Sequence, residues 1–361
     1  MASTRATEGG TPTGSARDPD EQSGEVTDTA AGPPSAGVSK SESKEGVPGG
    51  AADKPTEIPA KGWLQVVKRG VKESSADQVP LLGAGVAFFA FLALFPAVIA
   101  VVSLYGFFAD PATIVDQVKS MTSALPEQAR SLITDQVTSR ASGGRTAFGV
   151  GAIVSIVIAL WSTSGGVGNL IAAINTAYDE EETRGFIKKR LLALAFTLGA
   201  IVFMVIMIAL VAVLPPLLNG LIGNTPLRWV LQIGRWVVLV LLVSVALAVL
   251  YRLAPDRDAP QMRWVSVGAV VATVIWLVAS IGFSVYVSTF GNYAKTYGVF
   301  AGIIVMLMWL WLTAYAILLG AEINAEAEQQ TAADTTKGPQ EPLGQRDAVK
   351  ADTTPGDEPN S

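Results

Sequence analysis

Six long hydrophobic runs without a charged side chain constrain this sequence more than any other feature. A charged residue bounds each run, and the runs cover residues 78–109, 146–178, 191–227, 236–251, 264–294 and 296–321. About 20 consecutive apolar residues are enough for one helix to span a bilayer. Within lipid, a helix satisfies all of its own backbone hydrogen bonds, whereas an open sheet does not. The runs therefore predict an all-α polytopic membrane protein with six transmembrane helices.

Details within the runs refine this topology. Pro96 stands in the middle of the first run, where a proline removes a backbone hydrogen bond and is expected to kink the helix. The fourth run is too short for a full span, so its helix must begin earlier and carry Arg235 inside it. We expect spans at about 80–108, 147–175, 191–214, 230–251, 264–289 and 298–321.

The segment between the first two spans, residues 110–145, is too polar for the hydrocarbon core. Its apolar residues nevertheless recur at helical spacing up to Leu125, and the pattern restarts after Pro126. We predict two extracytoplasmic amphipathic helices here. Two roles are open for them: they cap the mouth of a cavity, or they rest on the outer leaflet.

The two ends of the chain differ in composition from its middle. Residues 1–60 carry a net charge of −5 and residues 322–361 one of −6, whereas residues 61–321 carry +6. Both ends are rich in Gly, Pro, Ser, Thr and acidic residues and lack apolar periodicity, which is typical of disorder. We predict disordered acidic tails at 1–60 and 329–361 around a membrane domain at 61–328. This domain opens with a short amphipathic helix on the membrane surface.

Lys and Arg are densest in three short loops, residues 61–77, 179–190 and 252–263. Short loops rich in these residues stay on the cytoplasmic side of a membrane. Both termini are therefore predicted to be cytoplasmic, a parity that six spans satisfy. Membrane lipids are the expected partners, and membrane-protein partners or a homo-oligomer are open alternatives.

The composition also excludes several kinds of chemistry. The chain has neither cysteine nor histidine, which removes the thiolate nucleophile, the usual general base and the commonest metal ligands. No GxxxxGK[ST] loop for nucleotides occurs, and no basic stripe is interleaved with aromatic residues as in nucleic-acid binders. We therefore predict no enzyme activity, no catalytic residue, no cofactor, no metal and no nucleic-acid partner.

The second run is the most informative stretch. As an unbroken helix it would measure about 50 Å, longer than the hydrocarbon core, so it must protrude, bend or break at Gly165–Gly166. One face at three-and-four spacing is small and polar. This face either packs closely on another helix, with Asn169 as the interhelical hydrogen-bonding group, or lines a polar cavity. The candidate cavity residues are Ser162, Ser164, Asn169, Asn175 and Arg235.

Charged residues suggest two further sites. Arg235 either snorkels to the interface or faces a wet interior, where it would anchor an anionic headgroup. At the cytoplasmic side, Arg184 and Arg190 belong to a basic cluster, and Glu322 follows the last span. We predict a salt bridge between this cluster and Glu322, with a structural or a gating role.

The turn between the last two spans carries aromatic and basic residues that form a candidate outer hairpin site. Its tyrosines are explained either by an interfacial aromatic belt or by a binding cage. The residues concerned are Tyr293, Lys295, Tyr297 and Gly298.

Five segments in order resemble the YihY/BrkB family of bacterial inner-membrane proteins, long labelled "ribonuclease BN". They are AFFAFLALFP (87–96), LWSTSGGVGNLIAAINTAY (160–178), YRLAP (251–255), YAKTYG (293–298) and LLGAEIN (318–324). The resemblance covers about Lys61 to Glu328 and implies six helices with both termini cytoplasmic in the plasma membrane. Ile174 stands where the family pattern has leucine, a conservative departure.

Function is the least determined property. The first hypothesis is a transporter or flippase of an anionic lipid or amphiphilic solute, which handling of envelope lipids by relatives also suggests. The second is a non-transporting envelope scaffold or assembly factor. A ribonuclease fits badly, because no histidine, cysteine or metal-binding carboxylate cluster is present to activate water.

Overall fold

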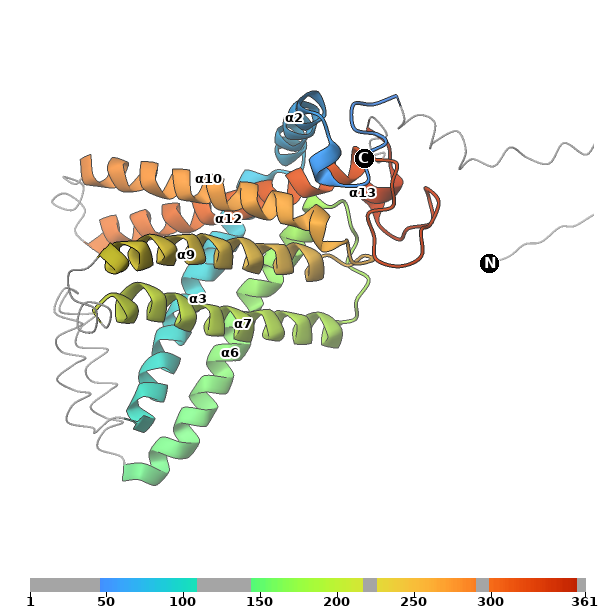
Figure 1. Ribbon diagram of the computed structural model, residues 1–361. Coiled ribbons are helices and arrows are strands. Elements are labelled where there is room, and N and C mark those ends of the chain that lie inside the picture. Colours follow the sequence, from blue (N-terminus) through green and yellow to red (C-terminus); the bar gives the residue numbers. More distant parts are fainter. Residues whose placement is uncertain (1–45, 109–143, 217–225, 290–298, 356–361) are drawn as a thin grey trace, which may run out of the picture. The chain divides into compact units, whose positions relative to one another are not determined.

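The computed structural model describes residues 46–108, 144–216, 226–289 and 299–355. The chain divides into two units, Met1–Ser35 and Ala36–Ser361, and every described residue lies in the second unit. Helices dominate this part of the chain (Figure 1). The long ones are α2 (Ala60–Ala76), α3 (Val79–Phe108), α6 (Gly144–Ala177), α7 (Phe186–Ile208), α9 (Pro226–Leu253), α10 (Met262–Thr289) and α12 (Val299–Gln329). The short ones are η1 (Pro55–Glu57), the π-helical turn η3 (Ala209–Val213) and α13 (Val349–Asp352).

Five of the described helices are long and apolar enough to cross a membrane. A bent pair, α2 with the first part of α3, brings the number to six if it counts as one span, and its two halves meet at 66°. This confirms an all-α polytopic membrane protein. The helix after Pro226 carries Arg235 inside it, as the short fourth run predicted.

The long helices pack in a row of neighbours. Helix α9 lies against α10, α10 against α12, α12 against α3, α3 against α6, and α6 against α7 (Figure 1). Helix α2 lies across the last turns of α12. Its residues Gly62, Val66, Gly70 and Ser74 recur every fourth position and form its buried face. A Cβ on Gly70 would stand 3.4 Å from the Ile323 side chain, so the missing side chain sets how closely the two helices approach.

The main core lies where α3, α7 and α10 begin and where α6, α9 and α12 end. Small residues dominate it, and Tyr178, Tyr251, Ile171, Ile174 and Leu318 are its largest fully buried side chains. Large apolar residues farther along the helices, such as Val202, Val205 and Ile281, are mostly exposed, as expected of surfaces that meet lipid.

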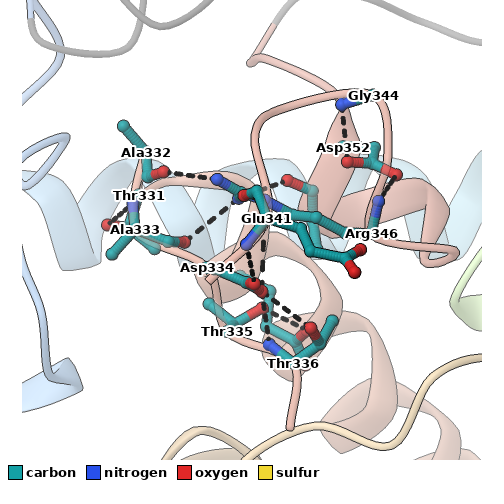
Figure 2. Close-up of polar contacts among 12 residues, drawn as sticks. Thr331, Ala332, Ala333, Asp334, Thr335, Thr336, Glu341, Gly344, Arg346 and Asp352 are labelled. Carbon is teal, nitrogen blue, oxygen red and sulfur yellow. Dashed lines mark hydrogen bonds and ion pairs between the residues drawn. The ribbon is translucent and has the colours of Figure 1, made fainter. Parts of the chain in front are cut away.

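The described part of the C-terminal tail is folded, contrary to the composition-based prediction. Residues 330–355, named here the C-terminal segment, pack against the bundle, and Gln330, Thr335 and Lys350 are buried. Thr336 bridges to Pro260 in a strand-like pairing. Figure 2 shows Arg346 donating to the carbonyls of Ala332, Ala333 and Glu341 at 2.8–3.2 Å. Composition fails here because backbone and carboxylate hydrogen bonds hold the segment together with a few buried apolar residues, Leu343, Ala348 and Ala351.

The prediction of a disordered N-terminal tail is also wrong from residue 46 onwards. Ala52 and Ile58 are buried against Trp264. Gln330 donates to the Pro48 carbonyl at 2.8 Å, and Thr331 donates to the Ala52 carbonyl at 2.6 Å. The stretch before α2 therefore contacts the start of the C-terminal segment.

Three further expectations concern helix geometry. Helix α6 does not break at Gly165–Gly166, since it is continuous over 34 residues. Helix α3 likewise continues through Pro96, and the bend that the structure measures lies earlier, between α2 and α3. The two amphipathic helices expected in 110–145 lie outside the described residues, apart from the first turn of α6.

Candidate functional site

Polar and charged residues gather at one end of the bundle, named here the charged end. It consists of the loop at 178–185, the loop at 254–261, the last turns of α12 from Glu322 to Gln329, and the C-terminal segment. The apolar run of the last span stops at residue 321, but α12 continues to Gln329 because Ala, Glu and Gln favour a helix. This continuation places five polar side chains, Glu322, Asn324, Glu326, Glu328 and Gln329, in buried positions.

The first cluster of the charged end joins α6 to the loop after α9. Asn175 accepts from the Asp256 amide at 2.9 Å and donates to Glu182 at 3.1 Å. Thr183 donates to Asp256 through both its amide and its hydroxyl at 2.7 Å, and the Arg184 guanidinium lies 2.7 Å from Glu182 and 3.3 Å from Asp256. Although burial acts in the opposite direction, the Thr183 hydrogen bonds and the Arg184 charge hold the pKa of Asp256 below its usual range.

A second cluster joins the loop after α9 to α12. Arg257 makes a bidentate pair with Glu328 at 2.8 and 2.9 Å, and both side chains are almost fully buried. The guanidinium also lies 4.3 Å from the centre of the Tyr178 ring. Thr335 donates to the same carboxylate at 3.0 Å. A buried ion pair with two hydrogen bonds between its members, and a third from Thr335 to the carboxylate, is tolerated in a low-dielectric environment.

A third cluster attaches the C-terminal segment and α2 to α12. Lys350 is buried and reaches Asp179 at 2.8 Å and Glu326 at 3.0 Å. Arg69 on α2 binds Glu326 from the other side at 2.5 Å. The Val349 amide donates to Glu180 at 2.9 Å. Two cations therefore share the Glu326 carboxylate.

A close contact of two helices completes the charged end. Asn324 accepts from the Gly268 amide at 2.7 Å and donates to the Val265 carbonyl at 3.1 Å. Gly268 and Gly320 face each other so closely that a Cβ on either would overlap the neighbouring helix. This contact between α10 and α12 is the small-residue packing that membrane helices use.

The predicted salt bridge between Glu322 and the basic cluster is wrong. Glu322 is fully buried, and neither of its carboxylate oxygens has a hydrogen-bond donor among the described residues. Arg184 pairs with Glu182 and Asp256, as given above, and Arg190 contacts Trp161. Charge counting placed all of these residues at the same end correctly. It gave no information on the direction of each side chain around its helix axis, which core packing decides.

The polar side chains on this face of α6 are exposed rather than packed on another helix, although Gly166 lies close to the Phe89 backbone of α3. Ser162 and Asn169 are exposed, and the Asn169 amide donates to the Gly165 carbonyl of its own helix at 3.0 Å. Ser164 is buried and donates to the Trp161 carbonyl at 2.8 Å. Asn175 belongs to the first cluster instead. The candidate cavity residues therefore divide between a surface and the interior, and they do not line one described cavity.

Arg190, in the second turn of α7, lies beside this surface. Its guanidinium stacks 3.9 Å from the centre of the Trp161 ring and donates to the Trp161 carbonyl. A terminal nitrogen lies 3.9 Å from the position that a Cβ on Gly165 would take. Nε is buried without a hydrogen-bond partner, and no carboxylate pairs with Arg190 in the described part of the chain.

Arg235 offers a similar arrangement near the start of α9. Its guanidinium lies 5.3 Å from the centre of the Trp236 ring, and its buried Nε has no hydrogen-bond partner among the described residues. Trp229, Gln232, Ile233 and Trp236 line a hollow on the adjoining turns. Helices α7 and α9 run in opposite directions, because α7 begins and α9 ends at the charged end, so the two arginines lie toward opposite ends of the bundle.

Several predicted site residues remain untested. Tyr293, Lys295, Tyr297 and Gly298 lie outside the described residues. Pro96 lies within a described helix, but its kink stays a prediction.

The acidic partners at the charged end escaped the sequence reasoning. A signal for them was present: Glu322, Glu326 and Gln330 recur every fourth residue beyond the apolar run, as do Asn324 and Glu328. Such spacing places two polar stripes on one helix. Each stripe could have been assigned a partner segment.

The continuous apolar helices, the small-residue contact of α10 with α12 and the charged end define a polytopic α-helical membrane protein. The sequence model of the family described as "Virulence factor BrkB" matches residues 71–344, and the chain belongs to this family. It is 37% identical over 254 residues to the ribonuclease-like protein YfkH of Bacillus subtilis, covering 67% of this chain and 87% of the relative. It is 25% identical over 290 residues to the UPF0761 membrane protein PBPRA3489 of Photobacterium profundum, covering 79% of this chain and 86% of the relative. No solved structure matches.

Proposed function

We propose that this membrane protein binds an anionic lipid or amphiphile and moves it between the two leaflets of a bacterial plasma membrane. The observation that carries the proposal is Arg190. It is a half-buried guanidinium at the start of a membrane-spanning helix, stacked on Trp161 and without a carboxylate partner among the described residues. Phosphate and carboxylate headgroups are the ligands that such a guanidinium binds in bidentate fashion.

The surface beside Arg190 suits a headgroup. Gly165 and Gly168 leave open space next to the guanidinium and on the adjoining turn of α6, while Ser162 and Asn169 expose polar groups. Polar groups on a membrane-spanning helix are costly to expose to hydrocarbon. A bound polar ligand or water offsets this cost.

Two arginines provide one candidate headgroup site toward each leaflet. Arg190 lies near the charged end, and Arg235 lies near the opposite end of α9, each beside a tryptophan ring. The density of basic residues in the short loops favours a cytoplasmic charged end. In this orientation Arg190 would receive a headgroup in the inner leaflet and Arg235 one in the outer leaflet.

Reconstituted liposomes test the proposal. The full-length protein should accelerate the transbilayer movement of a labelled anionic phospholipid more than that of a zwitterionic one. Arg190→Gln and Arg235→Gln should each slow this movement about tenfold or more, because a charge-assisted hydrogen bond is worth about 1.5–3 kcal/mol. Lys188→Gln is the matched control, since Lys188 is exposed two residues from Arg190.

Two outcomes would refute the proposed function. The first is a movement no faster than in protein-free liposomes across anionic and zwitterionic labels. The second is that the Arg190→Gln and Lys188→Gln variants move the labelled lipid at the same rate. A scaffold that only assembles envelope proteins would give the first outcome and would bind partner proteins instead.

Ribonuclease activity is not proposed. The chain contains no histidine or cysteine, and its described part holds no group of three or more acidic residues placed to bind a metal ion. Incubation of the purified protein with RNA and Mg²⁺ is expected to give no cleavage above that of a mock purification.

A further inference from the structure

Glu322 is a buried carboxyl group that the clusters of the charged end do not explain. Its side chain is fully buried in the last turns of α12, and both carboxylate oxygens lack a donor among the described residues. An ionised carboxylate offers only acceptors, so burial without a donor is strongly unfavourable. The protonated form removes the charge and supplies a hydroxyl donor of its own.

Asp77 is the acceptor that this hydroxyl would need. Its carboxyl group is within side-chain hydrogen-bonding reach of Glu322. Asp77 lies at the junction of α2 and α3, where the two helices bend by 66° and the next residue, Gln78, takes the left-handed backbone conformation with φ of 54°. The pair therefore connects the bend to the end of α12.

The cations nearest to the pair are already bound by other carboxylates. Lys350 lies close enough to affect both groups, but its ammonium binds Asp179 and Glu326. Arg69 also binds Glu326. Glu73 and Tyr178 also interact with the pair, and neither supplies a positive charge.

The burial of Asp77 also favours retention of a proton by the two carboxyl groups. Burial first, and the negative charge of Asp179 second, raise the pKa of Asp77 from 3.8 to about 6. Two carboxyl groups in contact in a partly dry site cannot both ionise cheaply, so one proton is retained between them.

We propose that Asp77 and Glu322 form a proton-binding site that holds one shared proton at neutral pH, with the Glu322 hydroxyl donating to the Asp77 carboxylate. Loss of this proton to water leaves two adjacent negative charges, which repel. The repulsion separates the α2–α3 bend from the end of α12. This site is distinct from the Arg190 surface, and its existence does not depend on lipid movement.

Infrared difference spectroscopy of the full-length protein in phosphatidylcholine nanodiscs tests the site. At pH 7 the wild type should show the C=O stretch of a protonated carboxyl group. Glu322→Gln should abolish this band. Glu181→Gln, an exposed substitution in the neighbouring loop, should leave it unchanged.

A second variant keeps the proposal open to refutation if Glu322→Gln does not fold. Asp77→Asn removes the negative neighbour and adds an amide donor, so the band should disappear at a pH lower by about one unit or more. The proposal is overturned if wild type shows no such band at pH 7, or if Asp77→Asn leaves the titration of the band unchanged. Loss of the band on adding Na⁺ or Ca²⁺ at constant pH would also overturn it, because the occupant would then be a cation.

The outcome is separable from that of the lipid proposal. The infrared band reports proton binding even in a protein that moves no lipid. Conversely, Glu322→Gln and Arg190→Gln are independent substitutions, so a failure of one assay leaves the other interpretable.

Discussion

The charged end and the exposed face of α6 use the same kinds of polar side chain in opposite ways. At the charged end, Arg257 is buried against Glu328 and Lys350 against Asp179 and Glu326. On α6, Asn169 bonds only its own helix, and Arg190 beside it contacts a tryptophan ring and a carbonyl. Polar groups with internal partners stabilise a fold, whereas polar groups left without them are available to a ligand.

The difference also separates stability from activity. Substitutions at the charged end should lower the free energy of unfolding, because they leave a buried partner unsatisfied. Substitutions on the α6 face should change ligand handling and leave the fold intact. The following predictions test this division, beginning with the largest effect.

Removal of Arg257 should have the largest effect on stability. Arg257→Ala leaves the buried Glu328 carboxylate without its bidentate partner, and such a loss costs about 3–5 kcal/mol. Denaturant unfolding of the purified protein in detergent measures it. Arg252→Ala, at the end of α9 and without an ion pair in the described part of the chain, is the matched control and should cost less than about 1 kcal/mol. Equal losses in the two variants would contradict the assignment of the charged end as the stabilising region.

The contact between α10 and α12 should give the next largest effect. Gly268→Ala places a methyl group against the Gly320 carbonyl and the Asn324 side chain, and overpacking of this kind costs about 1–3 kcal/mol. On the same helix, Gly282 has open space at the Cβ position. Gly282→Ala should therefore be neutral or slightly stabilising, since alanine favours a helix over glycine. A comparison of the two melting temperatures in detergent decides the point.

The docking of the C-terminal segment should depend on pH through Glu180. Burial raises the pKa of this carboxyl group from 4.5 to about 7 in the folded protein. The folded state therefore binds more protons than the unfolded state between these values, so its stability is greatest below pH 4.5 and falls as the pH rises to about 7. Hydrogen exchange at the Val349 amide, which donates to Glu180, should accelerate over this window.

Glu180→Gln should remove most of this pH dependence, because glutamine does not titrate. Glu181→Gln is the control, since Glu181 is exposed in the same loop. The opposite result is a wild-type exchange rate at the Val349 amide that changes with pH only as that of an unprotected amide does. This result would show that Glu180 ionises without affecting the segment.

Uncharged hydrophobic runs were sufficient to predict the membrane helices. The run from 264 to 294 became α10, and the short fourth run became a helix that begins at Pro226 and includes Arg235. These properties follow from backbone hydrogen bonding in lipid, which acts on each segment separately. The sequence of each segment was therefore enough to predict whether that segment forms a membrane helix.

The partners of the polar residues were not predictable in the same way. Glu322 was expected to meet Arg184 or Arg190, yet its neighbour is Asp77, 245 positions earlier in the chain. The direction of each side chain depends on how Leu318, Ala321 and Ala325 pack against the other helices. This packing is a property of the assembled bundle. For the same reason the C-terminal segment looked like a tail, although its Arg346 and Asp334 have specific partners.

Arg190→Gln should have the smallest effect on stability. The substitution removes a cation–π contact with Trp161, worth about 0.5–1 kcal/mol where water reaches the cation, and a hydrogen bond to the Trp161 carbonyl, but it breaks no ion pair within the described residues. Unfolding in detergent should therefore differ from wild type by less than about 1 kcal/mol, although the same variant is expected to slow lipid movement about tenfold. Arg190→Lys retains the charge and loses the planar guanidinium, so it should be equally stable and intermediate in transport. If Arg190→Gln instead destabilised the protein as strongly as Arg257→Ala, Arg190 would be a structural residue. The α6 face would then no longer be supported as a ligand-binding surface.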